Sequence, residues 1–194
     1  MRETEITVQV FDTMQNVEKQ LIKLGFEIPE RYHMKDWYFS KYTTDELKAM
    51  SYLDIINNSV IVRYICDDSP RTYLVYKKKE MDKDDNVIAE EKYNVILSDT
   101  DDARKILNMA GMNNWCEVVN DSIVFSKDGV VFVLQDIEDL GVFIEYEEDE
   151  SMSNMTDEEK FRYMQDYLTG LNLNLGADFS CKKVYMKFLK ENAL

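Results

Sequence analysis

Two pairs of glutamates in this 194-residue chain have the spacing of a carboxylate metal site. Glu3 and Glu5 form the first pair, and Glu145 and Glu147 form the second. On a β-strand, residues i and i+2 point to the same face about 6 to 7 Å apart, so both can reach one divalent cation directly or through water. Four carboxylates converge if the two strands are neighbours, and such an oxygen-rich site suits Mg²⁺, Mn²⁺ or Ca²⁺. A solvated strand face is the alternative for either pair by itself.

The composition disfavours most other catalytic chemistries and several classes of partner. His33 is the single histidine and the three cysteines are scattered, which argues against Cys/His pairs, Ser-His-Asp triads and histidine-rich metal sites. A formal charge of −15 disfavours nucleic acid and anionic membrane surfaces as partners. The first residues do not resemble a secretory signal and the cysteines suit a reducing compartment, so we expect a cytoplasmic protein.

The pattern of the first 25 residues predicts a strand followed by a helix. Residues 3–10 alternate polar and apolar side chains, as in a half-buried strand. Asp12 is the expected N-cap of the helix, and Gly25 is its expected stop. The same unit recurs where a strand ending at Leu97 is followed by a helix that stops at Gly111. We interpret this as an internal duplication, with chance similarity of two capped helices as the alternative.

The same patterns predict the remaining elements. Further strands are expected at residues 35–40, 59–66, 71–79, 87–97, 116–125, 129–135 and 141–147, with a polar hairpin tip at 81–86 and a short helix at 44–51. Thr156 and Glu159 form a capping box for a helix ending near Leu168, and a last helix carries Val184. Most methionines, Met109 among them, have the spacing of helical core positions.

These elements predict a single α+β domain over residues 1–194, with a strand-rich part at 2–147 and C-terminal helices at 156–191. The expected architecture is an eight-stranded antiparallel β-barrel or tunnel with two similar halves and flanking helices. Because the helices cover the apolar face of the sheet, the polar face must line a hydrated lumen or face water. We expect a common interior for Glu3, Glu5, Thr7, Gln9, Arg63, Lys77, Glu145 and Glu147.

Several motifs follow one another in the order of a known family. Residues 3–7 read Glu-Thr-Glu-Ile-Thr, residues 60–63 stand where that family has a Leu-Arg-x-Arg strand, and residues 74–77 resemble its Leu-Thr-Tyr-Lys strand. Residues 134–147 carry the most specific match, to the signature Leu-Asp-x-Val-Glu-Gly-Leu-Gly-x-Phe-x-Glu-x-Glu. Together these motifs resemble the CYTH family, which includes class IV adenylyl cyclases and thiamine triphosphatases. The resemblance extends from residue 2 to about residue 190.

The resemblance implies a tunnel in which basic side chains hold a triphosphate and carboxylates hold Mg²⁺ or Mn²⁺, ready for hydrolysis or for cyclisation of a nucleotide. The metal-ligand positions are matched by Glu3, Glu5, Glu145 and Glu147. The expected substrate-binding residues are Arg63, Lys77, Lys92 and Lys183, with Lys182 as the alternative to the last. The partner implied is a small phosphorylated molecule, and a homodimer is an open alternative for the oligomeric state.

Other positions depart from the family pattern. Thr7 replaces a lysine, Ile61 an arginine and Gln135 a metal-binding aspartate. Basic residues of the family pattern are also replaced here, by Glu90, Asn120 and Ser122. With these changes the inferred lumen sets three cations against five carboxylates, so we expect it to repel a triphosphate unless divalent ions are bound. The cations are Arg63, Lys77 and Lys92, and the carboxylates are Glu3, Glu5, Glu90, Glu145 and Glu147. Ile61 and Ile65 share the face of Arg63 and should make part of the lumen apolar.

Three functions are therefore open. The leading one is a metal-dependent enzyme of the CYTH type acting on a nucleotide or organic triphosphate. The second is a non-catalytic ligand-binding protein that keeps the tunnel but has a degraded phosphate site. The third is an acidic interaction module, for which the net charge of −15 is the evidence.

Overall fold

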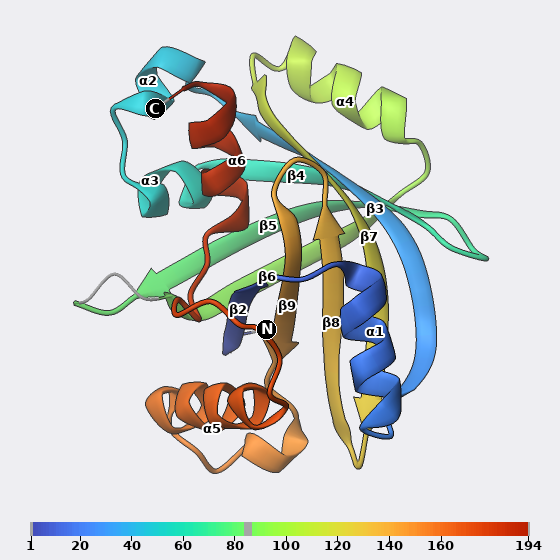
Figure 1. Ribbon diagram of the computed structural model, residues 1–194. Helices are drawn as coiled ribbons and strands as arrows, with labels where there is room; N and C mark the ends of the chain where they lie inside the picture. Colours follow the sequence, from blue (N-terminus) through green and yellow to red (C-terminus); the bar gives the residue numbers. More distant parts are fainter. Residues whose placement is uncertain (1, 84–86, 194) are drawn as a thin grey trace.

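The computed structural model describes residues 2–83 and 87–193, which form a nearly closed antiparallel β-barrel flanked by helices (Figure 1). The strands are β1 (Arg2–Glu3), β2 (Glu5–Val10), β3 (Glu27–Ser40), β4 (Ser59–Cys66), β5 (Arg71–Met81), β6 (Val87–Leu97), β7 (Asn113–Lys127), β8 (Val130–Ile137) and β9 (Gly141–Glu147). The helices are α1 (Met14–Lys23), α2 (Thr44–Lys48), α3 (Tyr52–Asn57), α4 (Thr100–Met109), α5 (Asp157–Gly170) and α6 (Lys183–Glu191), with a short 3₁₀ turn at Glu150–Met152. The predicted antiparallel barrel with outer helices is confirmed.

The first strand closes the barrel by pairing on both sides. Around the sheet the strands follow the order β1-β6-β5-β4-β3-β7-β8-β9-β2. The strand is interrupted at Thr4, whose backbone N–H donates to Glu148 Oε2 at 2.8 Å. Residues before the break pair with β6, and residues after it pair with β9. The first strand is thus split in two, so the structure has nine strand segments where the sequence predicted about eight.

The predicted two halves are visible in the strand order. Each half has one strand, a helix and then three strands, β2-α1-β3-β4-β5 and β6-α4-β7-β8-β9, and the first half also carries α2 and α3 between β3 and β4. The order around the barrel is symmetric about the β3–β7 pair, so that β4 corresponds to β8 and β5 to β9. Both helices stop at glycines with positive φ, Gly25 at +88° and Gly111 at +83°. The predicted N-cap Asp12 is wrong, because the Thr13 side chain accepts the Asn16 backbone N–H.

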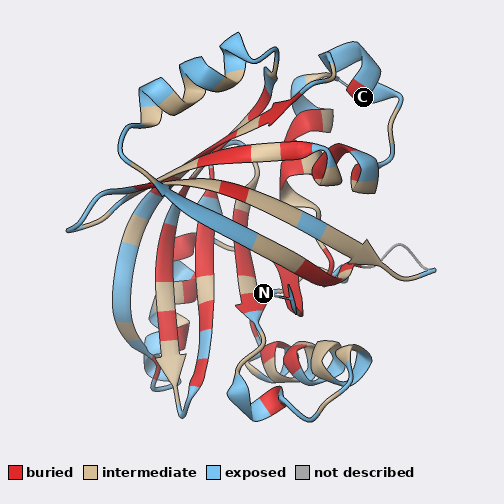
Figure 2. Ribbon diagram, turned by 180° about the vertical axis from the view of Figure 1, so that it is seen from behind, coloured by how far each residue is buried: buried red, intermediate tan, exposed pale blue. Residues whose placement is uncertain are grey.

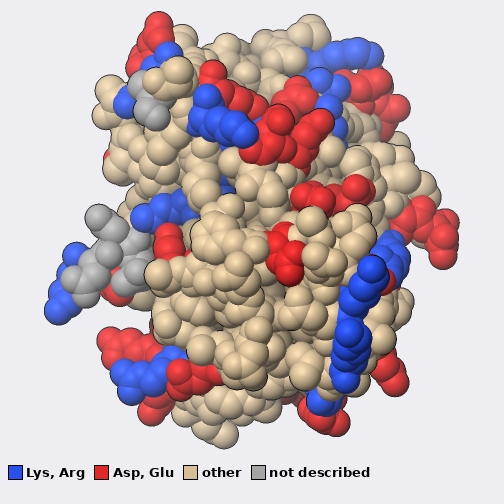
Figure 3. Space-filling model, viewed as in Figure 1, with Lys and Arg blue, Asp and Glu red and all other residues tan. Residues whose placement is uncertain are grey.

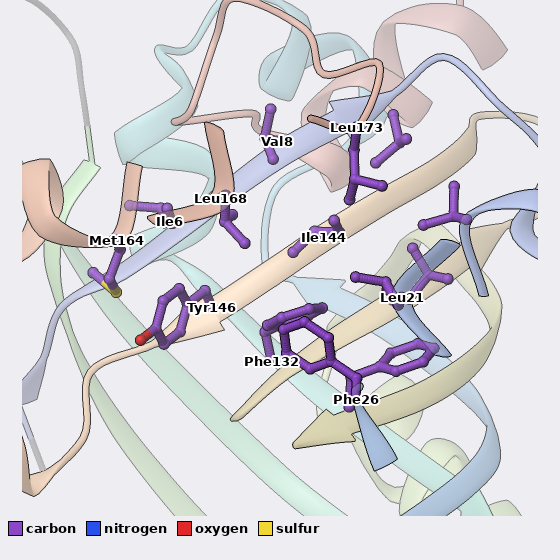
Figure 4. Packing of buried hydrophobic residues seen from close by; sticks show 14 of the residues in the cluster. Ile6, Val8, Leu21, Phe26, Phe132, Ile144, Tyr146, Met164, Leu168 and Leu173 are labelled. Atoms are coloured by element: carbon purple, nitrogen blue, oxygen red, sulfur yellow. The ribbon is translucent and has the colours of Figure 1, made fainter. Parts of the chain in front are cut away.

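Three apolar clusters attach the helices to the barrel, and buried positions alternate along the strands (Figure 2). The largest joins α1 and α5 to the outer faces of β2, β8 and β9. In Figure 4, Leu21, Phe132, Tyr146 and Leu168 project into this cluster from α1, β8, β9 and α5. Each fully buried side chain of this size contributes about 1.5 to 3 kcal/mol to stability. This packing turns the apolar face outward to the helices and the polar face inward.

The second cluster reaches into the barrel. Phe143 and Ile137 lie on the same strand faces as Glu145 and Gln135, and they pack with Val184 and Phe188 of α6. This apolar plug fills part of the interior and places the first residue of α6, Lys183, at the remaining cavity. The third cluster is small and joins α4 to Trp37, Phe39 and Val62.

Some sequence expectations are wrong in detail. Met109 is 89% exposed and not in the core, because α4 packs on the barrel through Ala103 and Leu107 and Met109 lies on the opposite face of the helix. Strand β3 begins at Glu27, eight residues before the predicted start at Lys35. The region of the predicted short helix contains two helices, α2 and α3. The predicted hairpin tip at 81–86 lies partly outside the described residues.

The described helices are all too short or too polar to cross a membrane. On the face seen in Figure 3, acidic and basic side chains are interspersed, with uncharged surface between them.

Candidate functional site

Alternation along β2 and β9 brings three carboxylates together inside the barrel. Glu5 pairs with Glu147 across the two strands, and Thr7 pairs with Glu145. The neighbouring residues Ile144 and Tyr146 belong to the outer apolar cluster, so the glutamates between and beside them point inward. Carboxylate oxygens of Glu5, Glu145 and Glu147 all lie within 4.8 Å of one another. This carboxylate triad can supply oxygen ligands to one hard divalent cation.

The carboxylate triad opens into a cavity of about 380 Å³. Its lining includes six of the eight residues expected to share an interior, namely Glu5, Thr7, Arg63, Lys77, Glu145 and Glu147. Glu3 lies outside the carboxylate triad, on the other side of the seam, and accepts a hydrogen bond from Lys92 Nζ at 2.8 Å. Gln9 points to the barrel end, where its amide donates to the Leu140 carbonyl at 3.3 Å.

Four lysines surround the carboxylate triad. Lys79 Nζ lies 2.7 Å from Glu5 and 2.8 Å from Glu90, and Lys77 Nζ lies 2.8 Å from Glu90. Lys92 Nζ bridges Glu3 at 2.8 Å and Glu147 at 2.9 Å. Lys183 Nζ donates to Glu145 and, at 2.6 Å, to Gln135. Three of these lysines were predicted from the sequence, and Lys79 was not.

The position of Lys79 could have been read from the strand pattern. It stands two residues after Lys77 on β5, so both ammonium groups project from one face. The charged cluster therefore consists of four lysines, Lys77, Lys79, Lys92 and Lys183, and five glutamates, Glu3, Glu5, Glu90, Glu145 and Glu147. The excess of negative charge is one, whereas the sequence argument counted three cations against the same five carboxylates. Repulsion of a triphosphate is thus weaker than expected.

The lysines set different pKa values for the three carboxylates of the triad. Burial would raise the pKa of Glu5, but Lys79 and Lys77 outweigh it and hold that pKa well below the usual range. Burial also opposes ionisation of Glu145, and Lys183 outweighs it, so that pKa is lowered. The pKa of Glu147 is instead raised, because desolvation and repulsion from Glu145 and Glu5 exceed the attraction of Lys92. Glu147 is the least compensated carboxylate of the triad.

Arg63, a predicted phosphate contact, is bound by another residue. Its Nε and one terminal nitrogen donate to the two carboxylate oxygens of Asp36 at 2.8 and 2.6 Å. The Asp36 side chain is only 3% exposed. The partner of the predicted phosphate ligand is thus a buried aspartate on the neighbouring strand β3. Arg63 therefore lines the cavity as half of a bidentate ion pair.

The departures from the family pattern lie at the same cavity. Thr7, Ile61, Asn120 and Gln135 belong to its lining. Ser122 donates to the Asn120 side chain at 2.9 Å, and Gln135 accepts from Lys183. Glu90 is completely buried, between Lys77 and Lys79. Lys182, the alternative to Lys183, places its ammonium over the Tyr52 ring at 5.5 Å from the ring centre.

A nearly closed antiparallel barrel with a carboxylate triad and lysines in its lumen is a tunnel-like α+β fold. No family model matches the sequence. The chain is 26% identical over 188 residues to the Methanocaldococcus jannaschii protein named "Putative adenylate cyclase MJ0240", covering 96% of this chain and 98% of that protein.

Solved structures agree with this relationship. The PH1819 protein of Pyrococcus horikoshii OT3 matches with a TM-score of 0.68 at 17% identity, over 98% of this chain and 99% of that one. The Hippeastrum protein called "Putative adenylyl cyclase HpAC1", described as having a dominant triphosphatase activity, matches with a TM-score of 0.64 at 12% identity, over 97% and 96%. The chain has the CYTH-like fold, which confirms the resemblance noted in its motifs.

Proposed function

We propose that this chain binds a nucleotide or organic triphosphate together with Mg²⁺ or Mn²⁺ in the barrel lumen and acts on its phosphoryl groups, by hydrolysis or by cyclisation. The observation that carries the proposal is the carboxylate triad, with oxygens within 4.8 Å of one another, in the same cavity as four lysine ammonium groups. The relative named as an adenylate cyclase and the neighbour described as a triphosphatase support it.

The donor set suits a hard divalent cation. The carboxylate triad offers only oxygen atoms, and Glu147 is undercompensated by cations, as its raised pKa indicates. Glu5, Glu145 and Glu147 would hold the ion, with Glu3 adjacent across the seam. A bound divalent ion neutralises phosphoryl oxygens and polarises the phosphorus centre.

The lysines supply the remaining recognition. Lys77, Lys79, Lys92 and Lys183 present ammonium groups as point charges that can move from a carboxylate to a phosphate oxygen. A triphosphate carries about four negative charges, and the charged cluster has an excess of one negative charge, so two divalent ions would bring the occupied site close to neutrality. Metal and phosphate should therefore bind cooperatively, each restoring the charge that the other displaces.

A non-catalytic phosphate-binding protein is the second candidate. The observation that favours it is the Arg63–Asp36 ion pair, which occupies the arginine expected to hold phosphate. Gln135, which stands in place of the signature aspartate, also favours the binding protein, because its amide oxygen accepts a hydrogen bond from Lys183.

One assay separates the two candidates. Phosphate release and cyclic nucleotide formation are measured over a panel of triphosphates with Mg²⁺ and Mn²⁺, for the wild type and for the Glu145→Gln/Glu147→Gln double variant. Glu158→Gln, a surface change on α5, is the matched control. Metal-dependent turnover that the double variant loses and the control keeps supports the enzyme. Metal-dependent binding of a triphosphate without turnover supports the binding protein, and turnover unchanged in the double variant places the reaction elsewhere.

A further inference from the structure

The lumen has two unlike walls, and strand order explains the division. The charged cluster comes from β5, β6, β1, β2 and β9, together with Lys183 of α6; these strands are continuous around the closing seam. Strands β4, β3 and β7 are also neighbours in the sheet, and they lie opposite the closing seam in the strand order around the barrel. A ligand in the cavity therefore meets charged groups from one side and the β4-β3-β7 wall from the other.

The β4-β3-β7 wall presents an apolar patch to the cavity, beside polar side chains from the same three strands. Ile61 and Ile65 of β4, Met34 of β3 and Val118 of β7 are among its lining residues. Register explains their common direction, because Ile65 pairs with Met34, and Arg63, between the two isoleucines, pairs with Asp36. We call Met34, Ile61, Ile65 and Val118 the apolar wall.

Two members of the apolar wall are buried without belonging to the core. Ile61 is 3% exposed and Met34 is 7% exposed, yet within the described chain neither is part of the three clusters that pack helices on the barrel. Their side chains shield one another and border the cavity instead. Buried apolar side chains that line a cavity rather than fill a core are typical of a ligand pocket.

Polar side chains beside the apolar wall are engaged with one another. Arg63 and Asp36 form a bidentate ion pair, and Ser122 donates to Asn120. A ribose or other hydroxyl-rich group placed here would have to compete with these bonds, whereas a hydrocarbon group would leave them intact. The pocket thus favours a ligand that is charged at one end and apolar at the other.

We propose that the ligand is an organic triphosphate whose non-phosphate part is a hydrocarbon group, held against the apolar wall while the phosphates meet the charged cluster. This inference rests on the proposed function and narrows its substrate class from nucleotide or organic triphosphate to apolar organic triphosphate. The volume of about 380 Å³ is within the range of small-molecule pockets, about 300 to 1,000 Å³, and leaves room beside the phosphates.

The test is a series of non-hydrolysable, methylene-bridged triphosphates that differ only in the esterifying group: none, methyl, ethyl, butyl and adenosine. Affinities are measured by calorimetry with Mn²⁺ in excess. Each methylene buried on the apolar wall should raise the affinity about fourfold, so the butyl ester should bind at least tenfold more tightly than the ethyl ester. The adenosine ester should bind more weakly than the butyl ester.

Two variants locate the effect, and a third controls for the substitution. Met34→Gln keeps the length of the side chain and adds an amide, and Ile61→Thr is a second, smaller change in case the first unfolds the protein. Either should lower the affinity for the butyl ester about tenfold and leave the unesterified anion within about twofold. Met109→Gln makes the same exchange at a side chain that is 89% exposed on α4 and should change neither affinity.

The outcomes separate this inference from the function on which it rests. If the unesterified anion binds with Mn²⁺ but affinity does not rise with chain length, or the adenosine ester binds best, the apolar substrate class is overturned and the proposed function stands. Equal loss for the anion and the butyl ester in Met34→Gln and Ile61→Thr also overturns it. If no member of the series binds with metal, the proposed function fails and this inference fails with it.

Discussion

Two neighbouring glutamates of the carboxylate triad should differ in how much stability the same isosteric substitution costs. In Glu145→Gln, Lys183 loses the carboxylate with which it forms an ion pair and keeps the neutral amide oxygen of Gln135 as an acceptor. The Lys183 side chain is 20% exposed. Breaking a buried ion pair costs about 3 to 5 kcal/mol, and an exposed pair about 0 to 1 kcal/mol. For this partly buried pair we expect the free energy of unfolding to fall by about 2 kcal/mol.

Glu147→Gln should be nearly neutral in the metal-free protein. The Glu147 side chain is 44% exposed, with Lys92 at 2.9 Å and the two other carboxylates of the triad within 4.8 Å. For a half-exposed group, attraction to Lys92 and repulsion by the carboxylates are each on the order of 1 to 3 kcal/mol, so they largely cancel. Lys92 also keeps Glu3 as a partner at 2.8 Å. The expected change in the free energy of unfolding is below about 1 kcal/mol.

With metal bound, the two glutamates should become comparably important. At a Mn²⁺ concentration about 100 times the dissociation constant, binding to the folded state adds about 2.7 kcal/mol, or roughly 5 to 10 °C in melting temperature for a chain of this size. Both variants should lose most of that shift, because each removes a ligand.

Urea unfolding with EDTA and thermal unfolding with and without Mn²⁺ measure the two effects, and Glu158→Gln is the control. Equal destabilisation of the two variants without metal would refute the assignment of lysine partners. A full Mn²⁺ shift in Glu147→Gln would refute its role as a ligand.

Three further outcomes follow from the same contacts. Because the pKa of Glu147 is raised, the metal-free protein should gain stability as the pH falls from neutral towards that pKa. Because the pKa values of Glu5 and Glu145 are lowered, the protein should lose stability below about pH 4.5. In urea unfolding at a series of pH values, Glu147→Gln should remove the gain in stability and leave the loss unchanged. Arg63→Met leaves Asp36 buried without its partner and should cost about 3 to 5 kcal/mol, most of which Arg63→Met/Asp36→Leu should recover; equal losses in both would contradict the ion-pair argument. With a net charge of −15, the protein should not bind duplex DNA at about 150 mM salt, and a micromolar mobility shift would contradict this.

Much of the barrel and part of the site follow from local patterns. Alternation of polar and apolar residues predicts the strands and the face on which each glutamate lies, since the period of a strand is two residues. The bounds of β4, β6 and β9 agree with the prediction for this reason. Glycine is needed at the positive φ of Gly25 and Gly111, which is why both helix ends could be read directly.

The partners of the charged residues depend on register and packing between distant segments. Asp36 meets Arg63 only because β3 and β4 pair in the register that sets them opposite each other, and their positions are 27 residues apart in sequence. Met109 was expected in the core, but α4 packs on the barrel through Ala103 and Leu107, and Met109, two residues past Leu107, lies on the opposite face of the helix.

The strand faces, the glycine stops of α1 and α4 and the inward direction of Glu5, Glu145 and Glu147 therefore follow from the sequence alone. Only the tertiary structure decided which lysine neutralises which carboxylate, and that Arg63 is bound by Asp36. Side-chain direction is a local property of the strand, whereas ion pairing falls off over a few ångströms and depends on how closely separate strands approach.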